Sequence, residues 1–278
     1  MSYSTLVDVP TLAAHLGDLD WLIIDVRHQL ADPAYGERVY GEAHIPGAAF
    51  LHCDRDLSGP MTGSNGRHPL PDPEKLAARL AALGVGSRTQ VVAYDDAQGM
   101  IAGRLWLLLR WLGHNRVAVL DGGLQAWLAA GGKMDAGGPG ARPETFVAQV
   151  RDCMVDAGYV QSFLATSRVF LVDARSPDRF RGENETIDPV GGHIPGAVNR
   201  FFRENLQAEG RFKPAAALRG EWLQLLAGRP AEQVVHQCGS GVSACHNMLA
   251  MEIAGLTGSR LYAGSWSDWC SDPTRPVA

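Results

Sequence analysis

The sequence has no long apolar run, no strong excess of charge of one sign and no basic leader, and each absence excludes a class of protein. Its longest apolar stretch, LWLLLRWL at 105–112, contains an arginine and is too short to span a bilayer. The formal net charge is −5 and both signs are spread along the 278 residues, which argues against a nucleic-acid-binding surface. The first twenty residues are acidic and are interrupted by Pro10, unlike a signal peptide. We therefore expect a soluble, cytoplasmic protein that binds neither nucleic acid nor membrane.

Cysteine is scarce, and no two cysteines form a CxxC pair. An odd number of cysteines argues against a disulfide framework, and a reducing cytosol keeps thiols free. The group Cys238, Cys245 and His246 fits no common zinc spacing, so no metal and no cofactor is expected. The five cysteines are Cys53, Cys153, Cys238, Cys245 and Cys270.

The chain repeats itself. WLIIDVR at 21–27 is echoed by VFLVDAR at 169–175, and the letters HIPGA at 44–48 recur at 193–197. Two further pairs follow in the same order, beginning at 90 and 233 and at 119 and 261. The members of each pair are separated by roughly half the chain, a usual domain size, so we interpret the sequence as a duplicated unit.

Within each unit, short apolar runs alternate with helical patterns. Residues 71–84 begin with Pro and Asp, place apolar residues three and four apart and end in Gly, which predicts a helix; 220–228 is its shorter counterpart. This alternation predicts an α/β fold with two tandem domains, each a mainly parallel sheet flanked by helices. The Gly- and Pro-rich stretch 131–145 is expected to be a linker, which gives domains 1–138 and 139–278.

The stretch CGSGVSA at 238–244 lies where a predicted strand, 233–237, gives way to a predicted helix. Successive amides in a Gly-rich loop can form an anion-binding nest at the positive end of a helix, and Gly239 and Gly241 permit the backbone angles needed. A cysteine at the first position of such a nest is expected to have a lowered pKa and to act as a nucleophile. Cys238 occupies that position, whereas Cys245 is expected to be a small buried hydrophobe.

The first unit has Asp95 where the second has Cys238. An acidic side chain at that position would repel a bound anion, so the first unit is predicted to be catalytically inert and the second to carry the chemistry.

These motifs together are similar to those of the two-domain rhodanese family of sulfurtransferases. The similarity rests on the Asp-x-Arg strands, HIPGA, the Cys-Gly loop and GSWSDW at 264–269, and it covers essentially the entire chain. It implies an inert N-terminal domain and a C-terminal cysteine that takes sulfane sulfur from a small-molecule donor as a persulfide and passes it to cyanide or a thiol. A thioredoxin-like reductant is a candidate partner.

The loop resembles CGSGVTA of the 3-mercaptopyruvate sulfurtransferase branch, with Ser243 in place of Thr. The thiosulfate-preferring branch has Arg and Lys where Gly239 and Ser240 stand, which makes a doubly charged donor less favoured. We therefore expect 3-mercaptopyruvate as donor, with thiosulfate as the alternative and a persulfide relay or binding module as the second alternative. A phosphatase would need a Cys-x5-Arg loop, and Ala244 stands at that arginine position.

The resemblance also assigns site residues. Arg179 matches the first substrate-binding arginine, while the second, about nine residues later, is missing from ENETIDPVG and leaves Arg181 as a substitute. Ser240, His68 and Asp54 match a proposed Ser-His-Asp relay. The backbone amides of 239–243 are expected to stabilise the cysteine sulfur, which assigns binding roles to Gly239, Gly241, Val242 and Ser243.

Overall fold

The computed structural model describes residues 2–138, 142–164, 166 and 168–278. The chain divides into two compact units. The first consists of 1–59, 71–152 and 209–211; the second consists of 60–70, 153–208 and 212–278. The predicted domain boundary between 138 and 139 falls at residues 139–141, which lie outside the described ones.

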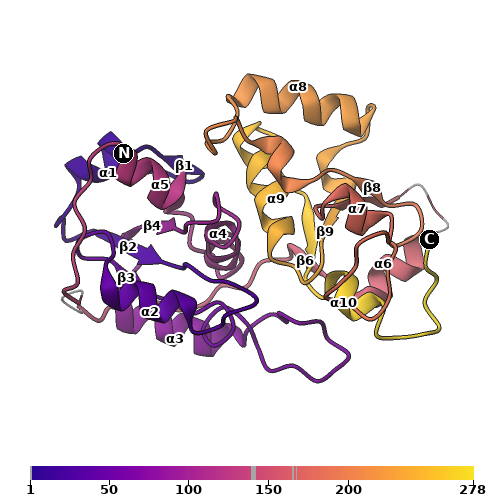
Figure 1. Ribbon diagram of the computed structural model, residues 1–278, viewed down its shortest axis with the longest axis horizontal. Coiled ribbons are helices and arrows are strands. Elements are labelled where there is room, and N and C mark those ends of the chain that lie inside the picture. The colour runs from indigo at the N-terminus through magenta and orange to yellow at the C-terminus, as the bar shows by residue number, and fades with distance from the viewer. Residues whose placement is uncertain (1, 139–141, 165, 167) are drawn as a thin grey trace. The chain divides into compact units, whose positions relative to one another are not determined.

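The first unit is a five-stranded parallel sheet with helices on its faces (Figure 1). The strand order is β1-β5-β4-β2-β3, and Ile24 of β2 is in register with Ala93 of β4. The elements are β1 (Leu6–Val7), α1 (Val9–Ala14), β2 (Trp21–Asp25), α2 (Tyr35–Glu42), β3 (Ala49–Phe50), α3 (Pro73–Leu83), β4 (Gln90–Tyr94), α4 (Ala102–Trp111), β5 (Val117–Leu120) and α5 (Gly123–Ala129).

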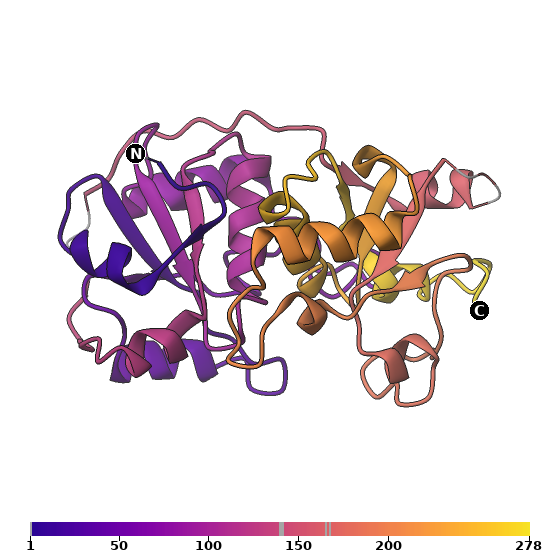
Figure 2. The same cartoon turned by 90° about the horizontal axis from the view of Figure 1, so that it is seen from above.

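The second unit repeats the same topology, with strand order β6-β10-β9-β7-β8 and parallel pairing throughout. Its longest helix, α8, packs against α9 (Figures 1 and 2). The elements are β6 (Met154–Val155), α6 (Ala157–Phe163), β7 (Phe170–Asp173), α7 (Pro177–Phe180), β8 (Val198–Asn199), η1 (Phe202–Asn205), α8 (Ala215–Leu226), η2 (Ala231–Gln233), β9 (Val234–Gln237), α9 (Ser243–Ile253), β10 (Arg260–Tyr262) and α10 (Ser265–Trp269). The predicted α/β fold with two tandem parallel sheets is confirmed.

The predicted helix over 71–84 is α3, and its ends follow from its sequence. The Asp72 side chain accepts a hydrogen bond from the Lys75 amide at 2.9 Å, and Pro73 occupies the first turn. Gly84 ends the helix in the left-handed conformation, with φ +108°. The counterpart predicted at 220–228 begins earlier, at Ala215, because the alanines before Gly220 are good helix formers.

The repeated Asp-x-Arg motif fastens the end of a central strand to the repeated HIPGA turn. Arg27 binds Asp25 and donates to the carbonyl of Ala43, just before the first HIPGA, at 2.7 Å. Arg175 binds Asp173 and donates to the carbonyl of Gly192, just before the second, at 2.8 Å. Both ion pairs are buried, and both arginines also donate to backbone carbonyls beside the HIPGA turns, so this part of the repeat is structural. Nη1 of Arg175 has no hydrogen-bond partner among the described residues and lies 3.5 Å from Glu185. In the part of the chain that the structure describes, no helix is long and apolar enough to cross a membrane.

Candidate active site

Cys238 stands between the end of β9 and the start of α9, as the sequence predicts. Its side chain is buried, and its Sγ accepts a hydrogen bond from the amide of Gly241 at 3.2 Å. The segment before and within α10 holds the loop in place, because the Cys238 amide donates to Ser265 Oγ and the Trp266 amide donates to the Cys238 carbonyl, at 3.1 and 3.0 Å. The sulfur therefore lies inside a turn of backbone that is fixed on both sides.

The two loop glycines serve different purposes. Gly241 has φ +76°, and a Cβ there would collide with the carbonyl oxygen of Ala263. Gly239 is not in the left-handed region; a Cβ there would lie 2.9 Å from Nη2 of Arg67 and 3.5 Å from Nη2 of Arg179. Both glycines were predicted to be needed for their backbone angles; this holds for Gly241, whereas Gly239 leaves room for two guanidinium groups.

Arg179, predicted to bind the substrate, lies on α7, and its guanidinium lies beside Gly239 of the loop. Its guanidinium donates three hydrogen bonds to Glu185, one from Nε at 3.0 Å and two from Nη2 at 2.8 and 2.9 Å, and Nη2 lies 3.3 Å from Asp188. Arg181, the substitute suggested for the missing second arginine, is exposed and binds Glu183. It does not join this cluster.

Arg67, in the stretch GRHPLP at 66–71, is a residue of the site that was not predicted from the sequence. The segment 60–70 belongs to the second unit, and Arg67 forms an ion pair with the buried carboxylate of Asp188. Burial lowers the pKa of the Arg67 guanidinium, while the charge of Cys238 opposes that effect. The only signal in the sequence was its position directly before His68.

Ser240 and His68 are brought together. His68 Nδ1 lies 2.7 Å from Ser240 Oγ, and both residues are buried. Asp54, the third residue of the expected relay, belongs to the first unit, where its amide donates to His52 Nδ1 and its carboxylate lies 3.7 Å from His28 Nε2.

The equivalent loop of the first unit is occupied by its own side chain. The buried Asp95 carboxylate accepts hydrogen bonds from the amides of Ala97, Gly99, Ile101 and Ala102, at 2.7 to 2.9 Å. Burial raises the pKa of Asp95, and the four amides oppose that shift. The nest of this unit is therefore filled by a covalently attached anion, so its amides are not available to a ligand.

Three of the other cysteines, Cys53, Cys245 and Cys270, are poor candidates for a nucleophile. Cys245 is fully buried in the first turn of α9 and donates to the carbonyl of Gly241 at 3.2 Å. Burial raises the pKa of Cys53 to about 12, and it also raises the pKa of Cys270. All five cysteines are free thiols.

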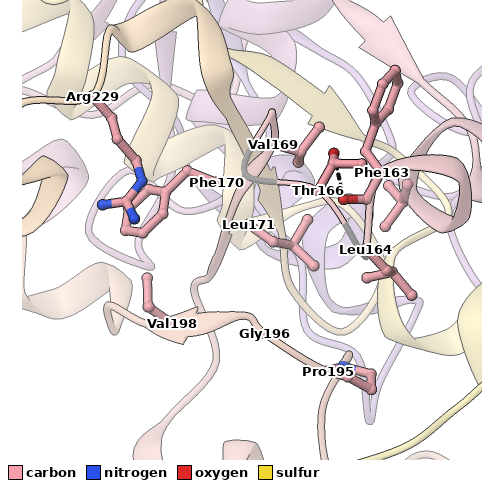
Figure 3. A pocket seen from close by; sticks show the side chains of 11 residues that line it. Phe163, Leu164, Thr166, Val169, Phe170, Leu171, Pro195, Gly196, Val198 and Arg229 are labelled. Carbon is pink, nitrogen blue, oxygen red and sulfur yellow. Dashed lines mark hydrogen bonds between the residues drawn. The ribbon is translucent and has the colours of Figure 1, made fainter.

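The second unit also has a cavity of about 290 Å³ between α6, β7 and β8 (Figure 3). Most of its lining side chains are apolar, and the polar ones are those of Thr166 and Arg229; the Arg229 guanidinium lies 4.8 Å from the centre of the Phe170 ring. Among the described residues, its lining does not include Cys238 or the arginines beside it. The lining residues are Val160, Phe163, Leu164, Thr166, Val169, Phe170, Leu171, Pro195, Gly196, Val198 and Arg229.

Comparison with known proteins relates both units to one domain type. The sequence pattern of the rhodanese-like domain matches residues 8–130 and 156–272. The chain is similar to a protein of Pseudomonas aeruginosa described as a probable 3-mercaptopyruvate sulfurtransferase, with 50% identity over 281 residues, covering 100% of this chain and 99% of the relative.

Two further similarities span most of the chain. SseB of Mycobacterium tuberculosis, described as a putative thiosulfate sulfurtransferase, is 38% identical over 262 residues, covering 92% of this chain and 89% of the relative. The crystal structure of SseA from Escherichia coli, described under 3-mercaptopyruvate sulfotransferases, matches with a TM-score of 0.80 and 30% identity, covering 95% of this chain and 99% of that chain.

Proposed function

Because the chain belongs to the rhodanese-like family, whose domain it carries twice, we propose that it is a sulfurtransferase that moves sulfane sulfur from 3-mercaptopyruvate to a thiophilic acceptor. The observation that carries the proposal is the Cys238 loop, with the Gly241 amide on the sulfur and the Arg179 guanidinium beside Gly239. The backbone of the loop can stabilise an anionic nucleophile, and the Arg179 guanidinium supplies a cationic hydrogen-bond donor for the carboxylate of the sulfur donor.

In the first half-reaction the Cys238 thiolate attacks the sulfur of mercaptopyruvate. The new S–S bond forms as the C–S bond breaks, and the electron pair of that bond goes to the carbon, which becomes the enolate of pyruvate. The proton of the donor thiol ends on that carbon, so the products are pyruvate and an anionic Cys238 persulfide. The loop amides, from Gly239 to Ser243, stabilise the sulfur charge before and after transfer.

Ser240 and His68 handle the proton and the developing oxyanion in this proposal. Their 2.7 Å hydrogen bond lets the imidazole accept the proton of the Ser240 hydroxyl, two residues after Cys238 in the loop. Asp54 is proposed as the third residue of the relay, on the strength of the family resemblance alone.

In the second half-reaction a nucleophile attacks the outer sulfur of the persulfide. With cyanide, the S–S bond breaks, thiocyanate leaves and the Cys238 thiolate is regenerated. A thiol acceptor, including that of a thioredoxin-like reductant, attacks the same sulfur in the same way. Since the cycle requires Cys238 to return to a free thiolate, we place the enzyme in a reducing compartment such as the cytoplasm.

The proposal is tested by comparing kcat/KM for 3-mercaptopyruvate and for thiosulfate, each with cyanide as acceptor. The wild type is expected to prefer 3-mercaptopyruvate, and Cys238→Ser is expected to lose turnover by a factor of about 10³ or more, because the covalent carrier is removed. Cys153→Ser, a change at a free cysteine outside the loop, is the matched control and should turn over like the wild type.

Thiosulfate is the second candidate donor, because two guanidinium groups beside Gly239 supply positive charge that the neutral loop side chains do not. A wild type that prefers thiosulfate would contradict the assignment of mercaptopyruvate. Absence of turnover with either donor, together with a Cys238 persulfide that a protein thiol discharges, would point to a relay module instead.

A further inference from the structure

Arg67 lies where a second donor-binding guanidinium is needed. We propose that Arg67, together with Arg179, binds the α-keto carboxylate of the donor, and that Asp188 positions both arginines. This inference rests on the proposed function and names a specificity-determining residue for it.

Contacts of the neighbouring backbone hold Arg67 beside the Cys238 loop. The Arg67 amide donates to Ser267 Oγ on α10 at 3.1 Å, and the next residue, His68, bonds to Ser240 within the loop. A Cβ on Gly66 would lie 2.6 Å from the Gly264 carbonyl oxygen, so the backbone is tightly packed there as well. The segment is therefore anchored on both sides of Arg67, and the guanidinium is held beside Cys238 rather than left in solvent.

The guanidinium groups of Arg67 and Arg179 both approach Gly239 of the loop. Nη2 of Arg67 lies 2.9 Å and Nη2 of Arg179 lies 3.5 Å from the position a Cβ on Gly239 would take. The residue after the nucleophile is thus covered by two planar donors that converge on one point. Nη2 of Arg179 already binds Glu185, but Nη1 lies 3.6 Å from the same position and is not among the atoms that bind Glu185 or Asp188. A planar anion such as a carboxylate could therefore accept from both guanidinium groups.

Residue 188 carries a charge opposite to the one expected at that position. Asp188 stands nine residues after Arg179, where the resemblance leads us to expect an arginine. Its buried carboxylate instead pairs with Arg67 and lies 3.3 Å from Nη2 of Arg179. An acidic side chain at that point would repel the donor carboxylate unless a nearby cation compensated for it. Arg67, from another segment of the chain, supplies the positive charge that an arginine at position 188 would otherwise provide.

The Arg67 guanidinium has hydrogen-bond donors that are not used by Asp188. Nη1 of Arg67 is used by Asp188, while its buried Nε has no hydrogen-bond partner among the residues that the structure describes. A buried donor without a partner is costly, and a bound carboxylate would satisfy it.

The cluster around these residues is balanced in charge. It contains three guanidinium groups and three carboxylates, those of Arg67, Arg175, Arg179, Asp173, Glu185 and Asp188. Such a cluster offers directed hydrogen bonds rather than a large positive field. It should therefore favour the singly charged carboxylate of mercaptopyruvate over the doubly charged thiosulfate.

The test uses the full-length chain with Arg67→Gln, Arg67→Lys and, as the matched control, Arg181→Gln. Arg181 is an exposed arginine that binds only Glu183 among the described contacts. We expect Arg67→Gln to raise the KM for 3-mercaptopyruvate by about 30-fold with a smaller change in kcat, because a ground-state ionic contact is lost. Arg67→Lys should recover only part of the loss, since lysine keeps the charge but not the fork.

A second readout separates binding from stability and from chemistry. In a Cys238→Ser background, the Kd for pyruvate, measured by calorimetry, should rise with Arg67→Gln and Arg67→Lys and stay unchanged with Arg181→Gln. If Arg67→Gln does not fold, the Kd of the Arg67→Lys variant for pyruvate tests the inference, because lysine retains the charge that pairs with Asp188.

Pyruvate affinity and KM within about threefold of the wild type in a folded Arg67 variant would overturn the inference while leaving the proposed function intact. A wild type that neither turns over mercaptopyruvate nor binds pyruvate would overturn both.

Discussion

The hydrogen bond between Ser240 and His68 is the clearest single contact that the proposed chemistry can be tested on. His68→Gln and Ser240→Ala should each slow the first half-reaction by about 10- to 100-fold, because a positioned proton carrier is lost. The second half-reaction needs no proton transfer to carbon and should keep its rate. Pyruvate release in a single turnover reports the first step, and thiocyanate formed from preloaded persulfide reports the second. Equal slowing of both steps would indicate that the pair only supports the loop.

His15→Asn is the matched control for that experiment. His15 is a half-exposed histidine that bonds Asp18 and stacks on Trp21 in the first unit. Its replacement should leave both half-reactions unchanged.

His236 of β9 predicts how stability depends on pH. Burial lowers its pKa to about 3, and neither ring nitrogen has a hydrogen-bond partner among the described residues. The folded imidazole stays neutral while the unfolded one takes up a proton below its usual pKa of 6.5. This contribution to stability is therefore present above pH 6.5 and is lost as the pH falls toward 3, by about 1.4 kcal/mol per pH unit.

His236→Phe should make the free energy of unfolding less sensitive to acid, because phenylalanine retains an aromatic ring beside Trp222 and does not titrate. Urea unfolding at pH 7 and pH 5 should show a difference smaller by about 2 kcal/mol in the variant than in the wild type. Identical losses in the two proteins would mean that His236 is already protonated or hydrated in the folded state.

The equivalent loops of the two units each surround a different acceptor. In the first unit the Asp95 carboxylate is the anion and takes four amides; in the second the sulfur of Cys238 lies in the corresponding turn. Asp95→Ala should destabilise the first unit by about 3 kcal/mol or more, because several buried amides lose their acceptor. Urea unfolding measures the loss, and Asp20→Ala, a change at an exposed residue, is the control. A loss below about 1 kcal/mol would mean that water replaces the carboxylate.

The elements were largely predictable because their signals are local. Buried β-branched runs, the Asp72 cap and the Gly84 stop lie next to the residues they organise, and the repeat supplied the strand signals twice. The same locality explains the position of Cys238 at the strand–helix junction.

The cluster around the loop was only half predictable, because its members come from distant segments. Arg179 could be found from its motif, whereas Arg67 reaches the loop from more than a hundred residues earlier in the chain. From the sequence, position 188 was notable only because the arginine expected there is absent. The pairing of Asp188 with Arg67 depends on tertiary contacts that sequence spacing does not reveal. The role of Gly239 was likewise hidden, since its need is space for side chains rather than a backbone angle.

At the scale of the molecule, the sequence duplication and the compact units do not coincide. Residues 60–70, from the first half of the sequence, belong to the second unit, and 209–211 belong to the first. The exchanged segment 60–70 carries both Arg67 and His68, so the second half of the chain lacks two proposed site residues when it stands alone. A cut between Asp152 and Cys153 therefore divides the sequence between repeats but also divides the site.

We accordingly expect the fragment 153–278 to turn over 3-mercaptopyruvate at least about 100-fold less efficiently than the intact chain, since the contacts of Arg67 and His68 are removed together. Co-expression with 1–152 should restore activity, and co-expression with 1–152 carrying Arg67→Gln should restore less of it. This last comparison separates a missing side chain from general instability of the fragment. Full activity of 153–278 alone would contradict the division of the site, and would mean that the loop, Arg179 and Asp188 form a complete site without the exchanged segment.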